Sequence, residues 1–328
     1  MTSHTLCVAP MLDYTDRHDR YFLRLISRHT RLYTEMVTSS AILRGDRNRF
    51  LNYHEAEHPL ALQLGGSDPV ELALCARIGE DYGYDEINLN VGCPSERVSS
   101  GSFGACLMAT PDVVAECVAA MREAAKSTPI TVKHRIGIDH QESYEHLHRF
   151  VDSVSNAGCN TFIVHARKAW LKGLSPKENR EIPPLDYDKV YRLKQDFPKL
   201  AFIINGGIKT LEQARQLISG THTKLDGAMI GREAYHNPYL LSQADRLFYD
   251  PNAAVKSRTD VLAQLIDYIQ VTSPPTPVYA ITRHILGLFQ GLPGARHWRQ
   301  QLSQRAIFEP NWLKILTQLK NEFSERGY

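Results

Sequence analysis

A cysteine and an asparagine stand together where a buried strand gives way to a turn. The strand includes Glu86, and Gly92 and Pro94 end it, which places Cys93 on a turn that the scaffold holds and a ligand can reach. The amide of Asn90, three residues earlier, can both donate and accept hydrogen bonds. A thiol beside an amide suits a planar substrate with an imide edge that must receive a proton. The alternative is that Cys93 is a small buried hydrophobe, the commoner role of cysteine.

The elements that must position this pair are short apolar runs alternating with amphipathic helices. Several runs are almost entirely apolar, as strands covered on both faces are. The expected strands cover residues 6–12, 32–37, 60–64, 86–91, 130–136, 161–166, 201–204 and 227–230, and the expected helices cover 16–29, 69–82, 111–126, 143–157, 187–197 and 211–219. This alternation predicts an α/β fold, a TIM (β/α)8 barrel. A doubly wound sheet is the alternative, but no GxGxxG follows the first strand.

The last part of the chain has a different pattern. Strand signals stop after residue 233, and amphipathic helices are expected over 260–270, 278–288 and 311–324. We therefore predict a catalytic barrel domain over 1–238 and a small all-α domain over 239–328. No apolar run approaches the roughly 20 residues of a membrane span, and the first residues lack the pattern of a signal peptide. The six cysteines show no metal-ligand spacing, so we expect reduced thiols and a cytoplasmic protein.

Polar side chains recur where the predicted strands end, which is the face of a TIM barrel that carries function. Lys133 is costly to bury inside a strand unless it meets an anion or a polar ring edge. It could also be a Schiff-base nucleophile, as in barrel aldolases. Together with Gln63 and His165 it forms a polar ring that matches the edge of a flavin, although either of the latter alone could be a satisfied interior group.

Glycine turns follow the last two strands. Gly206 with Gly207, and Gly231 beside Arg232, allow the backbone to approach an oxyanion and favour a phosphate site over simple tight turns. A flavin would place its phosphate tail there. FMN fits better than FAD, because no separate adenine-binding module is visible.

Charge is unevenly distributed along the chain, although the net charge is only +2. Residues 1–163 carry 15 Lys and Arg against 21 Asp and Glu, whereas residues 164–328 carry 23 against 15. A polyanion would be attracted to the second half, although a chance excess on a solvated surface gives the same asymmetry. Trp298 lies between Arg296 and Arg299, either as a stacking platform for nucleic acid or as core of the helical domain. Arg283 and Arg305 are further candidates for gripping a phosphate backbone.

Along nearly its whole length the chain resembles the tRNA-dihydrouridine synthases. The motifs that carry the resemblance are APM at residues 9–11, NVGCP at 90–94, VKHR at 132–135, VHAR at 164–167, NGGI at 205–208 and GR at 231–232. The segment over 167–180 resembles the A-type bacterial subfamily, which modifies uridines 20 and 20a of the D-loop. Ala166, where many relatives of other subfamilies carry glycine, agrees with that assignment.

The resemblance implies a task for many of these residues. It implies that FMN is the cofactor, that NADPH is the reductant and that Cys93 is the proton donor. The implied FMN ligands are Pro10, Met11, Leu12, Gln63, Lys133, His165, Asn205, Gly206, Gly207, Gly231 and Arg232. The implied tRNA contacts are Asn90, Lys177, Arg180, Arg296 and Arg299. No metal site is expected.

The implied reaction reduces uridine to 5,6-dihydrouridine in two half-reactions. NADPH reduces FMN, whose N5 gives a hydride to uracil C6 while Cys93 protonates C5. A thiol with an ordinary pKa of about 8.5 stays mostly protonated at neutral pH, as a donor must. Asn90 would hydrogen-bond the uracil edge, and the target base must leave its stack to enter a barrel mouth. Residues 99–105 look like a lid over that mouth.

Three other functions fit parts of the sequence. An FMN barrel oxidoreductase acting on a small-molecule pyrimidine or enone would share the site but would not need a basic helical tail. An aldolase would use Lys133 and no flavin. A non-catalytic tRNA-binding protein would be colourless and indifferent to the loss of Cys93. The reading that joins all motifs is a monomeric enzyme acting on tRNA.

Overall fold

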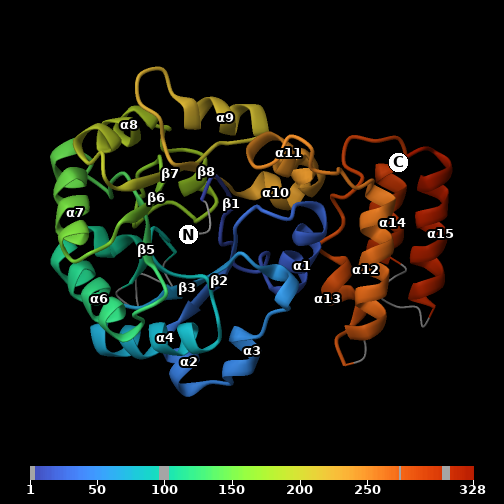
Figure 1. Ribbon diagram of the computed structural model, residues 1–328, viewed down its shortest axis with the longest axis horizontal. Helices are drawn as coiled ribbons and strands as arrows, with labels where there is room; N and C mark the ends of the chain where they lie inside the picture. Colours follow the sequence, from blue (N-terminus) through green and yellow to red (C-terminus); the bar gives the residue numbers. More distant parts are fainter. Residues whose placement is uncertain (1–3, 96–102, 273–274, 305–310) are drawn as a thin grey trace. The chain divides into compact units, whose positions relative to one another are not determined.

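The computed structural model describes residues 4–95, 103–272, 275–304 and 311–328. Its central element is a parallel eight-stranded sheet in the order β1-β8-β7-β6-β5-β4-β3-β2 (Figure 1). Cys7 pairs in parallel with Arg31, just ahead of β2, and so closes the sheet into a barrel. The predicted TIM barrel is confirmed. Its strands are β1 (Leu6–Val8), β2 (Leu32–Thr38), β3 (Leu60–Gly65), β4 (Glu86–Val91), β5 (Ile130–Arg135), β6 (Thr161–His165), β7 (Ala201–Asn205) and β8 (Gly227–Ile230).

The described residues divide into two compact units. The barrel unit comprises Met1–Leu12, Arg31–Tyr53 and His58–Gly231, and the helical unit comprises Asp13–Thr30, His54–Glu57 and Arg232–Tyr328. The helical unit thus includes a segment that directly follows the first barrel strand in the sequence. These units describe how compactly the residues cluster and do not test whether a segment folds on its own. The domain boundary between residues 238 and 239 therefore stays a prediction.

Strand bounds agree with the sequence expectation to within one residue, except in β1. The strand expected over 6–12 ends at Val8. The next residue, Ala9, donates a last hydrogen bond to the carbonyl oxygen of Ile230 at 2.8 Å. Pro10 then follows, and because it has no N–H it cannot extend the ladder. The chain therefore leaves the barrel earlier than its apolar character suggests.

The helices of the barrel unit begin where the sequence offers capping residues. The carboxylate of Asp68 accepts hydrogen bonds from the N–H groups of Val70 and Glu71, and Pro69 occupies the first helical turn, as expected for a helix start. The polar stretch after β2 forms two short helices. The helical elements of this unit are α2 (Ser39–Arg44), α3 (Arg47–Leu51), α4 (Pro69–Asp81), η2 (Gly104–Ala109), α6 (Pro111–Ala124), α7 (Tyr144–Asn156), η3 (Glu178–Arg180), α8 (Tyr187–Asp196) and α9 (Leu211–Ser219).

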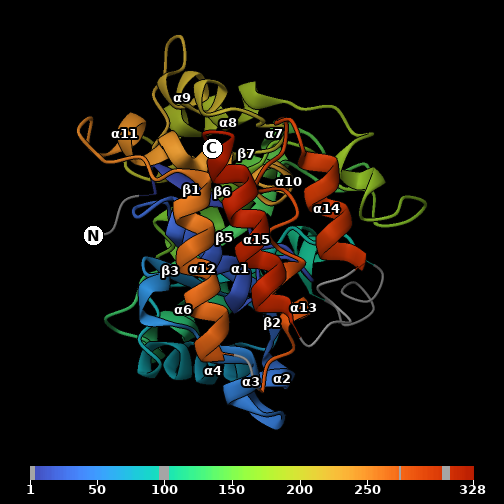
Figure 2. The same cartoon turned by 90° about the vertical axis from the view of Figure 1, so that its right-hand side faces the viewer.

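The helical unit departs from the expectation at two places. The helix expected over 278–288 ends at Thr282, and the turns after it bring Gly287 so close to His236 that a Cβ would lie 2.3 Å from the carbonyl oxygen. A ten-residue helix over 295–304 was not expected. In Figure 2, α12 and α15 of this unit run side by side. The elements are α1 (Arg17–Ile26), η1 (Glu55–Glu57), α10 (Arg232–His236), η4 (Pro238–Gln243), α11 (Ala244–Phe248), α12 (Arg258–Thr272), α13 (Val278–Thr282), α14 (Ala295–Gln304) and α15 (Trp312–Glu325).

The barrel interior contains both an apolar cluster and a set of buried polar side chains. An apolar cluster of strand residues contains Ile163, Ile203 and Met229 of β6 to β8. The polar side chains come from β3, β4 and β5, where Gln63 and Thr131 are each only 1% exposed. None of the described helices combines the length and the apolar character that a membrane span requires.

Candidate active site

The turn after β4 holds Cys93 at the mouth of the barrel. The side-chain oxygen of Asn90 accepts hydrogen bonds from the N–H groups of Gly92 (3.1 Å) and Cys93 (3.0 Å). The carbonyl oxygen of Cys93 accepts from the N–H of Ala105 at 2.9 Å. The thiol is half-buried and lies 3.7 Å from the hydroxyl oxygen of Ser95. The turn is therefore fixed by hydrogen bonds while its side chain keeps access to the mouth, as the sequence predicts.

Four of the other five cysteines are buried, unlike Cys93. All six are free thiols. Burial raises the pKa of Cys75, Cys117 and Cys159 to about 12 each, so these thiols are inert packing groups. Cys106 is half-buried, like Cys93, but its thiol is held against the carbonyl oxygen of Phe103 at 3.1 Å. The small-hydrophobe interpretation therefore fits the fully buried cysteines and not Cys93.

A lysine points into the mouth from β5. The Nζ atom of Lys133 donates to the side-chain oxygen of Asn205 at 3.1 Å. Because β6 separates β5 from β7, this bond crosses the barrel interior. Burial, followed by the positive charge of Arg135, lowers the pKa of Lys133 to about 7. A partly buried amine with a cationic neighbour suits an anionic or electron-rich ligand.

The two remaining members of the predicted polar ring lie in the same mouth. The pKa of His165 is held well below its usual value by burial and by the charges of Arg135 and Lys133, so the imidazole is neutral. Gln63 lies deeper: its oxygen accepts from Asn90 Nδ2 at 2.8 Å, and its nitrogen donates to Asn88 Oδ1 at 2.8 Å. The structure therefore brings Gln63, Lys133 and His165 to one end of the barrel, as expected.

The glycine turns after β7 and β8 are of two kinds. Gly206 and Gly207 have φ values of +117° and +70°, and a Cβ on Gly207 would lie 2.5 Å from Leu185. Their own packing therefore already requires glycine at these two positions. A Cβ on Gly231 would instead meet only Ala9, at 3.9 Å, so open space lies beside it. Gly231 leaves room for a ligand to approach the backbone.

The other predicted flavin ligands lie where the chain passes from one unit to the other. Pro10 and Met11 follow β1 and are half-buried, whereas Leu12 is 62% exposed. Arg232 opens α10 and belongs to the helical unit. Their contact with FMN stays a prediction.

The predicted tRNA contacts lie on the surfaces of both units. Lys177 and Arg180 are exposed in the loop after β6, and Arg296 and Arg299 are exposed on α14. Arg299 donates to the side-chain oxygen of Gln290 at 3.0 Å. Of the lid over 99–105, residues 99–102 lie outside the described residues, as does Arg305.

Trp298 is part of the core of the helical unit, so a stacking platform for nucleic acid at this residue is excluded. The side chain is fully buried, and its Nε1 donates to the carbonyl oxygen of Ile285 at 2.9 Å. Its ring packs edge-on against Phe289 and Phe323. Arg283, named with it as a phosphate contact, pairs with Asp16 at 2.7 Å. A tryptophan between basic residues on a helix can thus point inward while its neighbours face solvent.

Arg135 is a residue whose role the sequence did not reveal. Its Nε donates to the carbonyl oxygen of Gly92 at 2.9 Å, and its Nη1 donates to the carbonyl oxygens of Lys168 (3.0 Å) and Asn179 (2.9 Å). Burial lowers its pKa only to about 10, so it remains charged. Arg135 therefore joins the Cys93 turn to the loop that carries Lys177. The available signal was a second cation two residues after Lys133 at the end of the same strand.

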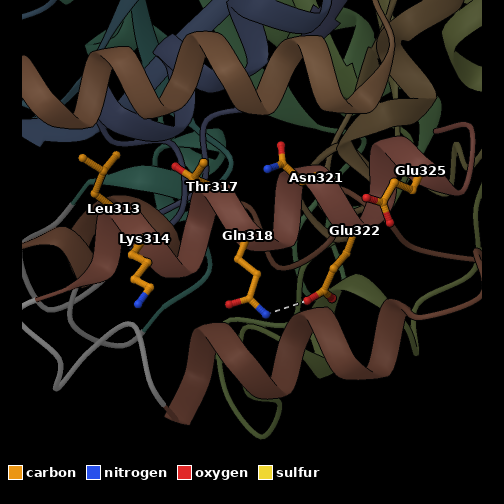
Figure 3. Close-up of a pocket in the computed structure, with 7 residues that line it drawn as sticks. All are labelled: Leu313, Lys314, Thr317, Gln318, Asn321, Glu322 and Glu325. Atoms are coloured by element: carbon orange, nitrogen blue, oxygen red, sulfur yellow. Dashed lines mark hydrogen bonds between the residues drawn. The ribbon is translucent and has the colours of Figure 1, made fainter.

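A hollow lies along α15 in the helical unit. This open groove of about 630 Å³ is lined by side chains between Leu313 and Glu325 (Figure 3). Gln318 donates to Glu322 at 2.9 Å, and Glu322 lies 3.6 Å from His297. The groove contains none of the predicted site residues, and its glutamates make it unsuited to phosphate.

The donor set at the barrel mouth fits FMN. Lys133 offers an amine that forms no ion pair with a carboxylate among the described residues, His165 offers a neutral ring, and Gly231 leaves space for the approach of a phosphate. Within the described ranges, no group of three or more His, Cys, Asp or Glu could hold a metal ion.

Comparisons with known proteins agree on one family. A model of the family described as dihydrouridine synthase (Dus) matches residues 7–323. The chain is 60% identical to a tRNA-dihydrouridine(20/20a) synthase of Shewanella oneidensis, over 92% of this chain and 89% of that protein. The chain is 57% identical to the protein of the same description from Vibrio cholerae, over 95% of this chain and 94% of that protein. A solved 2-naphthoyl-CoA reductase complex has a TM-score of 0.54 at 10% identity and shares the fold alone, covering 73% of this chain and 49% of that one.

Proposed function

This chain belongs to the dihydrouridine synthase family, and from that premise we propose that it reduces uridine to 5,6-dihydrouridine at positions 20 and 20a of the tRNA D-loop. The observation that carries the proposal is a half-buried Cys93 held on a hydrogen-bonded turn in the same barrel mouth as Lys133. The description that relatives about 60% identical share supports the substrate and the positions.

The family is flavin-dependent, and we propose FMN as the cofactor and NADPH as its reductant. When bound, FMN supplies the hydride that uracil C6 receives. Lys133 and His165 would hold the ring edge, and the backbone at Gly231 would receive the phosphate. The remaining proposed ligands are Pro10, Met11, Leu12, Gln63, Asn205, Gly206, Gly207 and Arg232.

The protein's own part in the chemistry is to supply a proton and to stabilise charge. Cys93 Sγ gives its proton to uracil C5, which is general-acid catalysis. Asn90 already uses its oxygen to hold the turn, so an N–H of its Nδ2 group is left for the uracil edge. The ammonium of Lys133 favours negative charge that develops in the mouth.

The tRNA must be gripped outside the mouth while one base enters it. We propose that Lys177, Arg180, Arg296 and Arg299 contact its phosphate backbone, a role that their exposure permits. The target uridine is extruded from its stack. We further propose a monomer that acts in the cytoplasm, where tRNA is present, with a helical domain over 239–328.

Replacement of Cys93 tests the proposal. We expect Cys93→Ala to keep bound flavin and its reduction by NADPH but to lose about 100-fold or more in the rate at which unmodified tRNA reoxidises the flavin. Cys106→Ala, at the other half-buried cysteine, is the matched control and should behave as wild type. Normal turnover by Cys93→Ala would remove Cys93 from the mechanism.

Other outcomes would favour the alternative functions. Equal activity on free UMP and on tRNA would indicate a small-molecule reductase. A colourless protein that borohydride links to a substrate at Lys133 would indicate an aldolase. Unchanged dihydrouridine at positions 20 and 20a in tRNA from cells lacking this protein would contradict the assigned substrate.

A further inference from the structure

A continuous chain of hydrogen bonds runs inside the barrel from the Cys93 turn to its opposite end. We call its five side chains the amide chain, and each is at most 9% exposed. Three of them alternate along β4 at the positions that face the interior, so the chain spans five residues of the strand, a rise of about 13 Å. From the mouth downwards, the amide chain consists of Asn90, Gln63, Asn88, Thr131 and Glu86.

Each step of the amide chain is a short hydrogen bond. Asn90 Nδ2 donates to Gln63 Oε1, and Gln63 Nε2 donates to Asn88 Oδ1, both at 2.8 Å. Asn88 Nδ2 donates to Thr131 Oγ1 at 2.8 Å, and that hydroxyl donates to Glu86 Oε1 at 2.5 Å. At the mouth, Asn90 Oδ1 accepts from the backbone of the Cys93 turn.

Glu86 anchors the lower end as a carboxylate. Burial alone would raise its pKa, but His4, Arg31 and the hydrogen bond from Thr131 together lower it to about 2. His4 Nε2 lies 2.6 Å and Arg31 Nη1 lies 3.3 Å from Oε2, and the Tyr33 hydroxyl donates to Oε1 at 2.9 Å. An ionised carboxylate only accepts hydrogen bonds.

The direction of every bond above Glu86 follows from this anchor. Thr131 has one proton and gives it to Glu86, so its oxygen must accept from Asn88. The amide oxygen of Asn88 then faces Gln63, and by the same reasoning the oxygen of Gln63 faces Asn90. The remaining polar atom of Asn90 is an oxygen, which is what the two N–H groups of the Cys93 turn require.

We propose that Glu86, at the end of the barrel remote from the chemistry, is a positioning residue for the proton donor, acting through the amide chain to fix the orientations of Gln63 and Asn90. With the amides reversed, Asn90 would present N–H groups to the N–H groups of Gly92 and Cys93, and the turn would lose both bonds. The consequence for catalysis rests on the proposed function, in which Cys93 donates the proton.

Thr131→Val is the sharpest test, because it removes the hydroxyl with little change of shape and leaves Glu86 with His4 and Arg31. In the flavin-free protein we expect the amide hydrogens of Gly92 and Cys93 to exchange about fivefold to tenfold faster, as loss of roughly one neutral hydrogen bond implies. Thr131→Ser keeps the hydroxyl and should restore wild-type exchange. Thr161→Val, at the start of β6 and outside the amide chain, is the matched control.

In the flavin-loaded enzyme, Thr131→Val should slow tRNA-dependent reoxidation of the flavin about tenfold at saturating tRNA, with little change in KM. Glu86→Gln, whose amide can donate to Thr131, should act in the same direction where it folds. A Thr131→Val protein with wild-type stability and unchanged exchange at Gly92 and Cys93 would overturn the proposal. Equal losses in Thr131→Val and Thr131→Ser would also overturn it. The exchange measurement does not depend on Cys93 chemistry, so it stands apart from the Cys93→Ala test of the proposed function.

Discussion

The lowered pKa of Lys133 should make the affinity for FMN, the proposed cofactor, depend on pH. In the free protein this amine is half protonated near pH 7, because burial and Arg135 lower its pKa to about 7. An electron-rich ring edge that accepts a hydrogen bond from Nζ binds the protonated form and returns its pKa towards the ordinary value near 10.4. Binding therefore takes up a proton whenever the pH exceeds 7, and affinity must fall as the pH rises.

The size of the effect follows from the fraction protonated. At pH 7 about half of the free protein carries the charge, and at pH 9 about one part in a hundred does, so the Kd should rise about 50-fold, or roughly 2.3 kcal/mol. The phosphate of FMN does not contribute, because its second pKa is near 6. His165 is neutral throughout, since its pKa lies well below 6.5, and Arg135 titrates only towards pH 10.

The assay is fluorescence quenching of FMN by flavin-free protein across pH 7 to 9. Lys133→Met keeps the length of the side chain without the charge, so its Kd should be weaker at pH 7 and nearly independent of pH. Cys93→Ala should keep the wild-type slope. A wild-type Kd that changes less than about threefold, or an equal slope in Lys133→Met, would refute the reasoning that Lys133 contacts the ligand as a cation.

Three further predictions concern residues that position the site or stabilise its scaffold. In Arg135→Lys the new side chain cannot reach three carbonyl oxygens at once, so tRNA-dependent flavin reoxidation measured by stopped flow should slow about tenfold or more while flavin stays bound. A wild-type rate would contradict the link between the Cys93 turn and the loop after β6. Trp298→Ala should lower the free energy of unfolding by about 3–5 kcal/mol in urea titrations. Arg296→Ala should leave that free energy unchanged and weaken tRNA binding in a salt-dependent way. Equal stabilities of the two variants would contradict the assignment of Trp298 to the core. Glu86 has a pKa near 2 in the folded protein and near 4.5 in the unfolded chain, so its charge contributes about 3 kcal/mol to the free energy of unfolding above pH 4.5. This contribution is lost as the pH falls towards 2. In Glu86→Gln the free energy of unfolding, measured by chemical denaturation, should therefore fall less between pH 4.5 and pH 2.

The barrel was predictable because its strands and helices have strong local signals. The run over 201–205 is short and apolar, and Asp68 with Pro69 marks a helix start before any tertiary contact is considered. The helix α14 lacked such a signal, because Ala295, Trp298 and Leu302 are the only buried residues among 295–303 and the other residues of the helix are polar in sequence. The helix expected over 278–288 was interrupted by a contact between Gly287 and His236, which are about fifty residues apart in the sequence. Local patterns predict elements well where they are strong, and long-range packing decides where they end.

Among the site residues, too, some were predictable from local sequence patterns and others depend on long-range packing. Cys93, Lys133 and His165 were predictable because strand ends meet at one face of a barrel, so position along the chain is enough to bring them together. The role of Arg135 depends on carbonyl groups of two loops, which carry no side-chain signature in the sequence. Trp298 was equally compatible with the surface and the core, since helical periodicity alone does not say which face is buried.

The strand β4 shows why the amide chain was missed. Its apolar residues Ile87, Leu89 and Val91 fitted a strand covered on both faces, and the polar residues that alternate with them were not considered together. In a parallel barrel, helices cover the outer face, so the apolar set can face outward while Glu86 and the asparagines face inward. Polar residues at every second position of such a strand are costly to bury unless each finds a partner. Their regular spacing is therefore itself evidence of a connected network, and a network that reaches the Cys93 turn ties the far end of the barrel to the geometry of the proposed proton donor.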